Sequence, residues 1–205
     1  MSPLPPPAPV SVHAFDFDGT LTVRDSFTAF LLWQCGHAAL ATAFLRHPYM
    51  LTDYLRTKDR GALKSHLLFH LMGPVTRPDL EQRFTAFAAA TGHSLFRPDA
   101  MVKWQSLASG NRIIVTASPA LLVGKFGQMI GADRTLGTEL GFDAHDRLTK
   151  ELASPNCRGA EKITRLKAAF GEDVVIESAF GDTSGDFEMI KAAREGHYRL
   201  FKARP

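Results

Sequence analysis

The chain has 205 residues, of which 45% are hydrophobic and 22% are charged, and its formal net charge is +3. These values are ordinary for a globular protein with a sizeable core, and the small, scattered basic excess argues against a nucleic-acid partner. The two cysteines, Cys35 and Cys157, are too few for a disulfide framework. We therefore expect free thiols and a cytoplasmic location.

The first nine residues contain five prolines, a composition that excludes a regular helix or an internal strand. They also lack the basic and apolar regions of a signal peptide. We predict that residues 1–9 form a disordered, proline-rich tail without a role in the chemistry.

Residues 10–17 form a short apolar run that ends in an aspartate-rich loop, as is typical of a buried strand. Residues 24–96 then carry Leu, Phe, Ala and Met at three- and four-residue spacing, which predicts several successive helices. We expect breaks between them at the pairs 47–48, 73–74 and 97–98, because each pair ends in proline.

One part of this helical block, residues 26–45, contains no Asp, Glu, Lys or Arg. Its length is sufficient to span a bilayer, but Gln34, Gly36 and His37 dilute its apolar character. We therefore favour a buried or surface-docked helix over a membrane-spanning one.

The second half of the chain alternates between helical and strand patterns. We expect helices at residues 98–109, 119–130, 159–170 and 187–193, strands at 112–116, 174–180 and 198–201, and short β pieces around a polar turn within 135–152. Strand–helix alternation at both ends of the chain, with an all-helical block between, predicts an α/β sheet that carries a helical insertion.

Polar side chains follow the predicted strands or lie just inside a helix. The candidates are Asp16, Asp18, Thr116, Lys162, Asp182 and Asp186. Ligands of parallel sheets bind at the carboxyl ends of the strands, so we expect these groups to meet there. Together they supply a nucleophile, an acid, metal ligands and a cation, which are the requirements of phosphoryl transfer.

Asp16 is the candidate nucleophile, which would form an aspartyl-phosphate. Asp18, two residues later, is the candidate general acid and base. Mg²⁺ prefers oxygen ligands and few carboxylates, which fits Asp16, the backbone carbonyl of Asp18, and Asp182. Gly19 lets the chain turn, and N–H groups near it are candidates to face phosphate oxygens.

The remaining candidates would bind or balance the phosphate. Thr116 would donate its hydroxyl to a phosphate oxygen, and Ser118 is a second candidate donor. Lys162 would balance phosphate and carboxylate charge, with Arg158 as a competitor for this role. Asp186 would orient Lys162 or a metal-bound water; alternatively it caps a helix.

Four motifs in the same order as here define a known family: Asp-Phe-Asp-Gly-Thr-Leu-Thr (16–22), Val-Thr-Ala-Ser-Pro (115–119), Gly-Ala-Glu-Lys (159–162) and Gly-Asp-Thr-Ser-Gly-Asp (181–186). The chain thus resembles the haloacid dehalogenase-like phosphatases, in particular their subfamily IB. The resemblance implies Mg²⁺-dependent hydrolysis by a Rossmann-like core, residues 10–22 and 97–205, with a helical cap, residues 23–96. The dehalogenases of this superfamily lack the second aspartate, so Asp18 favours phosphate esters.

The sequences of the motifs, with Asp25-Ser26-Phe27 after the first motif, resemble phosphatidylglycerophosphatase C more than phosphoserine phosphatase. That resemblance implies a lipid phosphate substrate and peripheral contact with the inner membrane. A soluble phosphomonoester such as phosphoserine is the alternative substrate.

Two alternatives of another class are a phosphotransferase and a catalytically silent binding protein on the same fold. The silent protein is disfavoured because every motif position carries a residue that is competent for catalysis. The sequence leaves the oligomeric state open.

Overall fold

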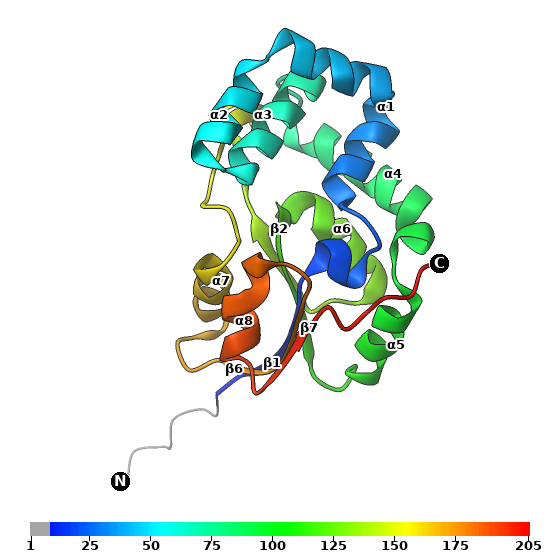
Figure 1. The fold of residues 1–205 in the computed structure, drawn as a ribbon, viewed down its shortest axis with the longest axis vertical. Helices are drawn as coiled ribbons and strands as arrows, with labels where there is room; N and C mark the ends of the chain where they lie inside the picture. The colour runs from blue at the N-terminus through cyan, green and yellow to red at the C-terminus, as the bar shows by residue number, and fades with distance from the viewer. Residues whose placement is uncertain (1–8) are drawn as a thin grey trace.

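The computed structural model describes residues 9–205. The predicted proline-rich tail, residues 1–9, lies outside the described residues except for Pro9. Figure 1 shows the two parts of the molecule: a sheet flanked by helices, and a group of further helices above it.

The sheet has five parallel strands in the order β3-β2-β1-β6-β7. The strands are β1 (Ser11–Phe15), β2 (Asn111–Pro119), β3 (Arg134–Thr138), β6 (Val175–Gly181) and β7 (Glu195–Tyr198). The central strand β1 pairs with β2 and β6, with Ala14 opposite Ile113 and Ala179. These side chains are fully buried, as expected of an apolar strand covered on both faces.

Helices cover both faces of this sheet, which confirms the predicted Rossmann-like α/β core. Trp104 of α5 (Pro98–Ser106) and Phe126 of α6 (Ala120–Ile130) belong to the hydrophobic cluster on one face. Leu166 of α7 (Ala160–Phe170) and Met189 of α8 (Phe187–Ala192) belong to the cluster on the other. The edge strand ends at Tyr198 rather than running over 198–201, because Arg199 adopts φ +54° and leaves the extended conformation.

The helical insert, residues 23–96, contains α1 (Ser26–Arg46), α2 (Tyr49–Thr57), α3 (Arg60–Met72) and α4 (Arg77–Leu95). The chain leaves and re-enters the core at one place, where Thr22 pairs with Phe96. The predicted breaks are present, but the one between α2 and α3 was missed. There Lys58 takes φ +57° and Asp59 caps α3 by accepting from Ala62 N, without any glycine or proline.

Helix α1 is, among residues 9–205, the one helix long and apolar enough to cross a membrane by length and composition. Its first turns carry the buried side chains Phe27, Phe30 and Leu31, whereas the rest of the helix, apart from the buried Ala43, is exposed or only partly buried. Gly36 interrupts the helical geometry with φ +77°. This arrangement matches the surface-docked helix of the prediction rather than a buried one.

A hairpin joins the insert to the core from the other side. It consists of β4 (Leu140–Phe142) and β5 (Leu148–Leu152), which pair antiparallel. Leu148 N donates to Val75 O at 2.8 Å, and Thr76 bridges to Arg147. The insert is therefore tied to the core at both Phe96 and the hairpin, and it lies over the carboxyl ends of the central strands (Figure 1).

Candidate active site

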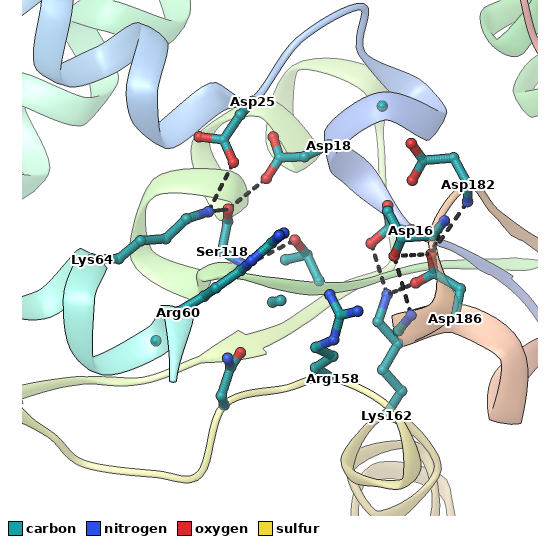
Figure 2. A pocket seen from close by; sticks show the side chains of 17 residues that line it. Asp16, Asp18, Asp25, Arg60, Lys64, Ser118, Arg158, Lys162, Asp182 and Asp186 are labelled. Atoms are coloured by element: carbon teal, nitrogen blue, oxygen red, sulfur yellow. Dashed lines mark hydrogen bonds and ion pairs between the residues drawn. The ribbon is translucent and has the colours of Figure 1, made fainter. Parts of the chain in front are cut away.

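A cavity of about 300 Å³ lies between the helical insert and the carboxyl ends of β1, β2 and β6. All the sequence-predicted site residues line it: Asp16, Asp18, Gly19, Thr116, Ser118, Lys162, Asp182 and Asp186. Figure 2 shows them in two groups, with Lys162 and three aspartates on one side and Asp18 with Ser118 on the other. The topology of the sheet therefore brings together motifs up to 170 residues apart, as 186 − 16 = 170.

Asp16 directly follows β1, and its backbone N–H donates to Phe180 O at 2.8 Å, which fixes it to the neighbouring strand. Asp16 is 7% exposed. Its carboxylate accepts hydrogen bonds from Lys162 Nζ at 2.7 Å and from Thr20 Oγ1 at 3.3 Å. Burial raises the pKa of Asp16 to about 7, although the Lys162 ammonium opposes this shift.

Lys162 lies in the first turn of α7 and is 1% exposed. Its ammonium contacts Asp16 Oδ1 and Asp186 Oδ1, each at 2.7 Å, and Val115 O at 2.6 Å. Burial alone would lower the pKa of Lys162, but the two carboxylates raise it well above its ordinary value. Since an ammonium has three donors, and all are engaged, Lys162 balances carboxylate charge instead of offering a free N–H to a ligand.

Asp186 has both carboxylate oxygens occupied. Oδ1 pairs with Lys162, and Oδ2 accepts from the backbone N–H groups of Asp182 and Thr183 at 3.2 and 2.9 Å. Although burial opposes the shift, Lys162 lowers the pKa of Asp186. Of the two roles predicted for Asp186, the pairing with Lys162 is present. Its contribution to capping comes from the third position of a capping box with Thr183, and not from the N-cap position.

Three carboxylates form a cluster suited to a metal ion. One oxygen each of Asp16, Asp182 and Asp186 lies within 4.8 Å of the others. Asp182 Oδ1 is buried and has no hydrogen-bond partner among the residues that the structure describes, and a buried carboxylate oxygen of this kind needs a cation or a donor. Lys162 and two backbone N–H groups engage Asp186, whereas Oδ2 of Asp16 accepts only a long hydrogen bond of 3.3 Å from Thr20. Asp16 and Asp182 are therefore the side chains that fit Mg²⁺ best.

Gly19 lies beside this cluster, in the loop after β1. Its φ is +86°, and a Cβ at this position would collide with the Asp182 carboxylate, so only glycine fits. Its N–H donates to Thr22 Oγ1 at 3.3 Å. The contact of N–H groups near Gly19 with phosphate oxygens stays a prediction.

Asp18 points away from the metal cluster. Oδ1 accepts from the backbone N–H of Ser26 at 2.7 Å, and Oδ2 accepts from Ser118 Oγ at 2.5 Å. Burial, followed by the nearby Asp25 carboxylate, raises the pKa of Asp18. Its side chain is thus unavailable to the cluster, and only its backbone carbonyl remains as the predicted metal ligand.

Thr116 and Ser118 end strand β2 with different contacts. Thr116 Oγ1 accepts from Ser118 N at 3.1 Å, and among residues 9–205 its hydroxyl donates to no acceptor, which leaves the hydrogen for a ligand. The Ser118 hydroxyl donates to Asp18 and lies 3.0 Å from Lys64 Nζ, which donates to it. The Ser118 hydroxyl therefore has one partner from the core, Asp18, and one from the insert, Lys64, and its contact with phosphate stays a prediction.

The insert contributes two basic side chains to the cavity, Lys64 and Arg60, which no sequence pattern predicted. Lys64 of α3 forms a salt bridge with Asp25 Oδ2 at 2.9 Å and reaches across the cavity to Ser118. Arg60, one turn earlier, also lines the cavity. Arg158, the competitor of Lys162, instead donates to Ser184 Oγ at 2.9 Å. No linear motif marks Lys64 or Arg60, since only the packing of the insert brings them to the site.

The fold and the site together define an α/β enzyme with a cluster of carboxylates at the carboxyl ends of its parallel strands. Residues 14–191 match the haloacid dehalogenase-like hydrolases, and the chain belongs to this family. Protein CicA of Caulobacter vibrioides (strain NA1000 / CB15N) is 43% identical over 194 residues, covering 94% of this chain and 87% of CicA.

Solved structures share the fold at low sequence identity. A protein with unknown function from Bordetella pertussis Tohama I has a TM-score of 0.72 at 17% identity, covering 90% of this chain and 87% of that one. A phosphoserine phosphohydrolase-like protein from Francisella tularensis subsp. tularensis SCHU S4 has a TM-score of 0.61 at 14% identity, with coverage of 92% and 85%. The resemblance therefore extends over the core and the insert together.

Proposed function

We propose that this hydrolase is a Mg²⁺-dependent phosphatase that cleaves phosphomonoesters through an aspartyl-phosphate on Asp16. The observation that carries the proposal is the divergence of two carboxylates only two residues apart. Asp16 joins Lys162 and the carboxylate cluster, whereas Asp18 lies across the cavity on Ser118 and Ser26. Such a pair supplies a charged nucleophile and a separate proton donor.

In the first step, a carboxylate oxygen of Asp16 attacks phosphorus and the bond from phosphorus to the ester oxygen breaks. That oxygen takes the proton of Asp18, and the alcohol leaves. Asp18, now ionised, accepts a proton from a water whose oxygen attacks phosphorus, and the bond to Asp16 breaks. Inorganic phosphate is released, and both aspartates return to their starting states. The raised pKa of Asp18 favours the protonated form that the first step needs.

The other residues of the cavity orient the nucleophile and stabilise the negative charge of the phosphate. Lys162 keeps Asp16 oriented through a buried ion pair, and the free hydroxyl hydrogen of Thr116 is directed to a phosphate oxygen. Mg²⁺, held by Asp16, Asp182 and the backbone carbonyl of Asp18, would supply positive charge to the phosphate oxygens.

We propose a lipid phosphate such as phosphatidylglycerophosphate as the substrate, hydrolysed in peripheral contact with the cytoplasmic face of the inner membrane. Large apolar side chains are exposed on α1 and α2 of the insert: Trp33, Leu45, Tyr49, Leu51 and Leu55. Basic side chains of the same segment, including Arg46, Arg56 and Lys58, would favour an anionic lipid surface. A soluble ester such as phosphoserine is the second candidate, supported by the fold shared with the phosphoserine phosphohydrolase-like protein.

Release of inorganic phosphate with Mg²⁺ tests the activity, using phosphatidylglycerophosphate in mixed micelles, phosphoserine and glycerol phosphate. Asp16→Asn should abolish release, whereas Asp173→Asn, which changes an exposed aspartate outside the cavity, should not. Turnover that survives Asp16→Asn would refute the proposed nucleophile. Transfer of phosphate to an acceptor instead of water would indicate a phosphotransferase, and no turnover of any ester would favour a silent binding protein.

A further inference from the structure

The helical insert contains a second cavity, of about 390 Å³, which is separate from the carboxylate cluster. It is lined mainly by apolar side chains of α1, α2 and α3: Phe27, Leu31, Leu40, Phe44, Leu63 and Leu67, with Thr28 and Tyr54. We call this cavity the insert groove. Its volume lies within the range of about 300–1,000 Å³ that small-molecule sites occupy.

The insert groove meets the active-site cavity at two basic residues. Arg60 and Lys64 line both cavities. Lys64 Nζ lies 3.0 Å from Ser118 Oγ in the active site and 5.3 Å from the centre of the Phe27 ring, which lines the groove. The Lys64 side chain therefore contacts both a polar residue of the active-site cavity and an aromatic residue of the insert groove.

This junction lies on the side of the site where the alcohol leaves. Asp18, the proposed proton donor to the leaving oxygen, accepts from Ser118, and Ser118 contacts Lys64. An alcohol released beside Asp18 thus lies next to Lys64, with the groove beyond it. Metal and phosphate groups belong on the opposite side, around Asp16 and Asp182 (Figure 2).

The charges at the junction suit an amphiphile. Asp25 already neutralises Lys64, whereas Arg60 forms no salt bridge with any residue between 9 and 205. A positive side chain at the mouth of an apolar groove favours a ligand that is polar or anionic at this point and apolar further on.

We propose that the insert groove binds an apolar chain carried by the alcohol part of the substrate whose phosphate lies on Asp16. This inference rests on the proposed phosphatase function and adds to it a subsite for the chain. The subsite selects amphiphilic phosphomonoesters by burying methylene groups between α1 and α3, beside the cations Arg60 and Lys64.

Binding of non-hydrolysable phosphonates tests the subsite without requiring turnover. We would compare octylphosphonate with ethylphosphonate by titration calorimetry, using the full chain with Mg²⁺ and ligand below its micellar concentration. Full burial of a methylene corresponds to about fourfold in affinity. Allowing about twofold each for partial burial, the six additional methylenes should make octylphosphonate bind about 60-fold tighter.

Variants of Leu40, a partly buried groove residue of α1, supply the contrast. Leu40→Asp should reduce the octyl-to-ethyl affinity ratio to about fivefold or less, and Leu40→Trp, which keeps the helix apolar but fills the groove, should also reduce it. Val102→Asp is the matched control, because Val102 is 72% exposed on α5 and lines neither cavity. It should leave the ratio unchanged.

The inference would be overturned by an octyl-to-ethyl affinity ratio near one in the unmodified chain, or by a high ratio that both Leu40 variants retain. Parallel assays of phosphate release from ethyl and octyl phosphate separate this failure from failure of the proposed function. Release from both esters with equal kcat/KM refutes the subsite alone. Tight octylphosphonate binding without release from any ester refutes the phosphatase proposal and keeps the groove as a chain-binding site.

Discussion

Removal of the Lys162 ammonium should destabilise the protein more than any surface charge change. Lys162 is 1% exposed and lies between Asp16 and Asp186, at 2.7 Å from each. Lys162→Met keeps the length of the side chain but leaves two buried carboxylates without their cation. Breaking a buried ion pair from one side costs about 3–5 kcal/mol, a large part of the stability of an ordinary domain. We expect the free energy of unfolding to fall by this amount in EDTA at pH 8.

The decrease in the free energy of unfolding caused by Lys162→Met should depend on pH and on Mg²⁺. The pKa of Asp16 is raised by burial to about 7 even with Lys162 present, and without the ammonium it rises further. A carboxyl with a raised pKa in the folded state loses stability as pH rises from its unfolded value through the folded one. The variant should therefore be penalised more at pH 8 than at pH 5.5. Mg²⁺ should reduce the penalty, because it binds the folded carboxylates.

Urea unfolding of the variant, with and without Mg²⁺, measures these differences. Lys167→Met is the matched control on the same helix, since Lys167 contacts Glu172 at 3.0 Å in an exposed pair, and it should change the unfolding free energy by less than about 0.5 kcal/mol. A loss below about 1 kcal/mol for Lys162→Met, or equal losses for the two variants, would refute the reasoning.

Three further predictions concern the catalytic groups. Ser118→Ala should lower kcat about tenfold, because hydrogen bonds to charged groups contribute about 1.5–3 kcal/mol. It should also move the basic limb of the pH profile to higher pH, since the lost hydrogen bond lowers the pKa of Asp18. An unchanged pH profile would count against the contact between Ser118 and Asp18. Gly19→Ala should weaken Mg²⁺ binding about tenfold in a calorimetric titration, because its Cβ displaces the Asp182 carboxylate; unchanged affinity would remove Asp182 from the metal site. Higher Mg²⁺ should shift the acid limb of kcat/KM to lower pH, because the metal competes with protons for Asp16; a limb independent of Mg²⁺ would show that Asp16 does not bind it.

Much of the core followed from local patterns. The apolar run before Asp16 and the run of residues 112–116 became neighbouring buried strands, because such runs need covering on both faces. The break after Thr57 was missed because Lys58 and Asp59 end one helix and cap the next without glycine or proline. The edge strand was placed several residues late for a similar reason: the left-handed turn at Arg199 leaves no signal in the sequence.

Some features of the candidate active site also follow from the sequence, and others depend on the tertiary structure. The sequence by itself predicted which polar side chains meet in the cavity, among them Asp16, Asp18, Lys162 and Asp182, because each follows a strand or opens a helix at the carboxyl edge of a parallel sheet. It also determined that an all-helical segment interrupts the core, since a helical period over residues 24–96 cannot be accommodated in strands.

Only the tertiary structure decided the partners of these side chains. The Ser118 hydroxyl contacts both Asp18 of the core and Lys64 of the insert, and the Gly19 N–H donates to Thr22 Oγ1 in a left-handed turn where Asp182 leaves no room for a side chain. The insert groove depends in the same way on three helices whose apolar faces leave a space beside Lys64. Side-chain spacing fixes which face of an element a residue occupies, whereas the distance between faces depends on how the elements pack.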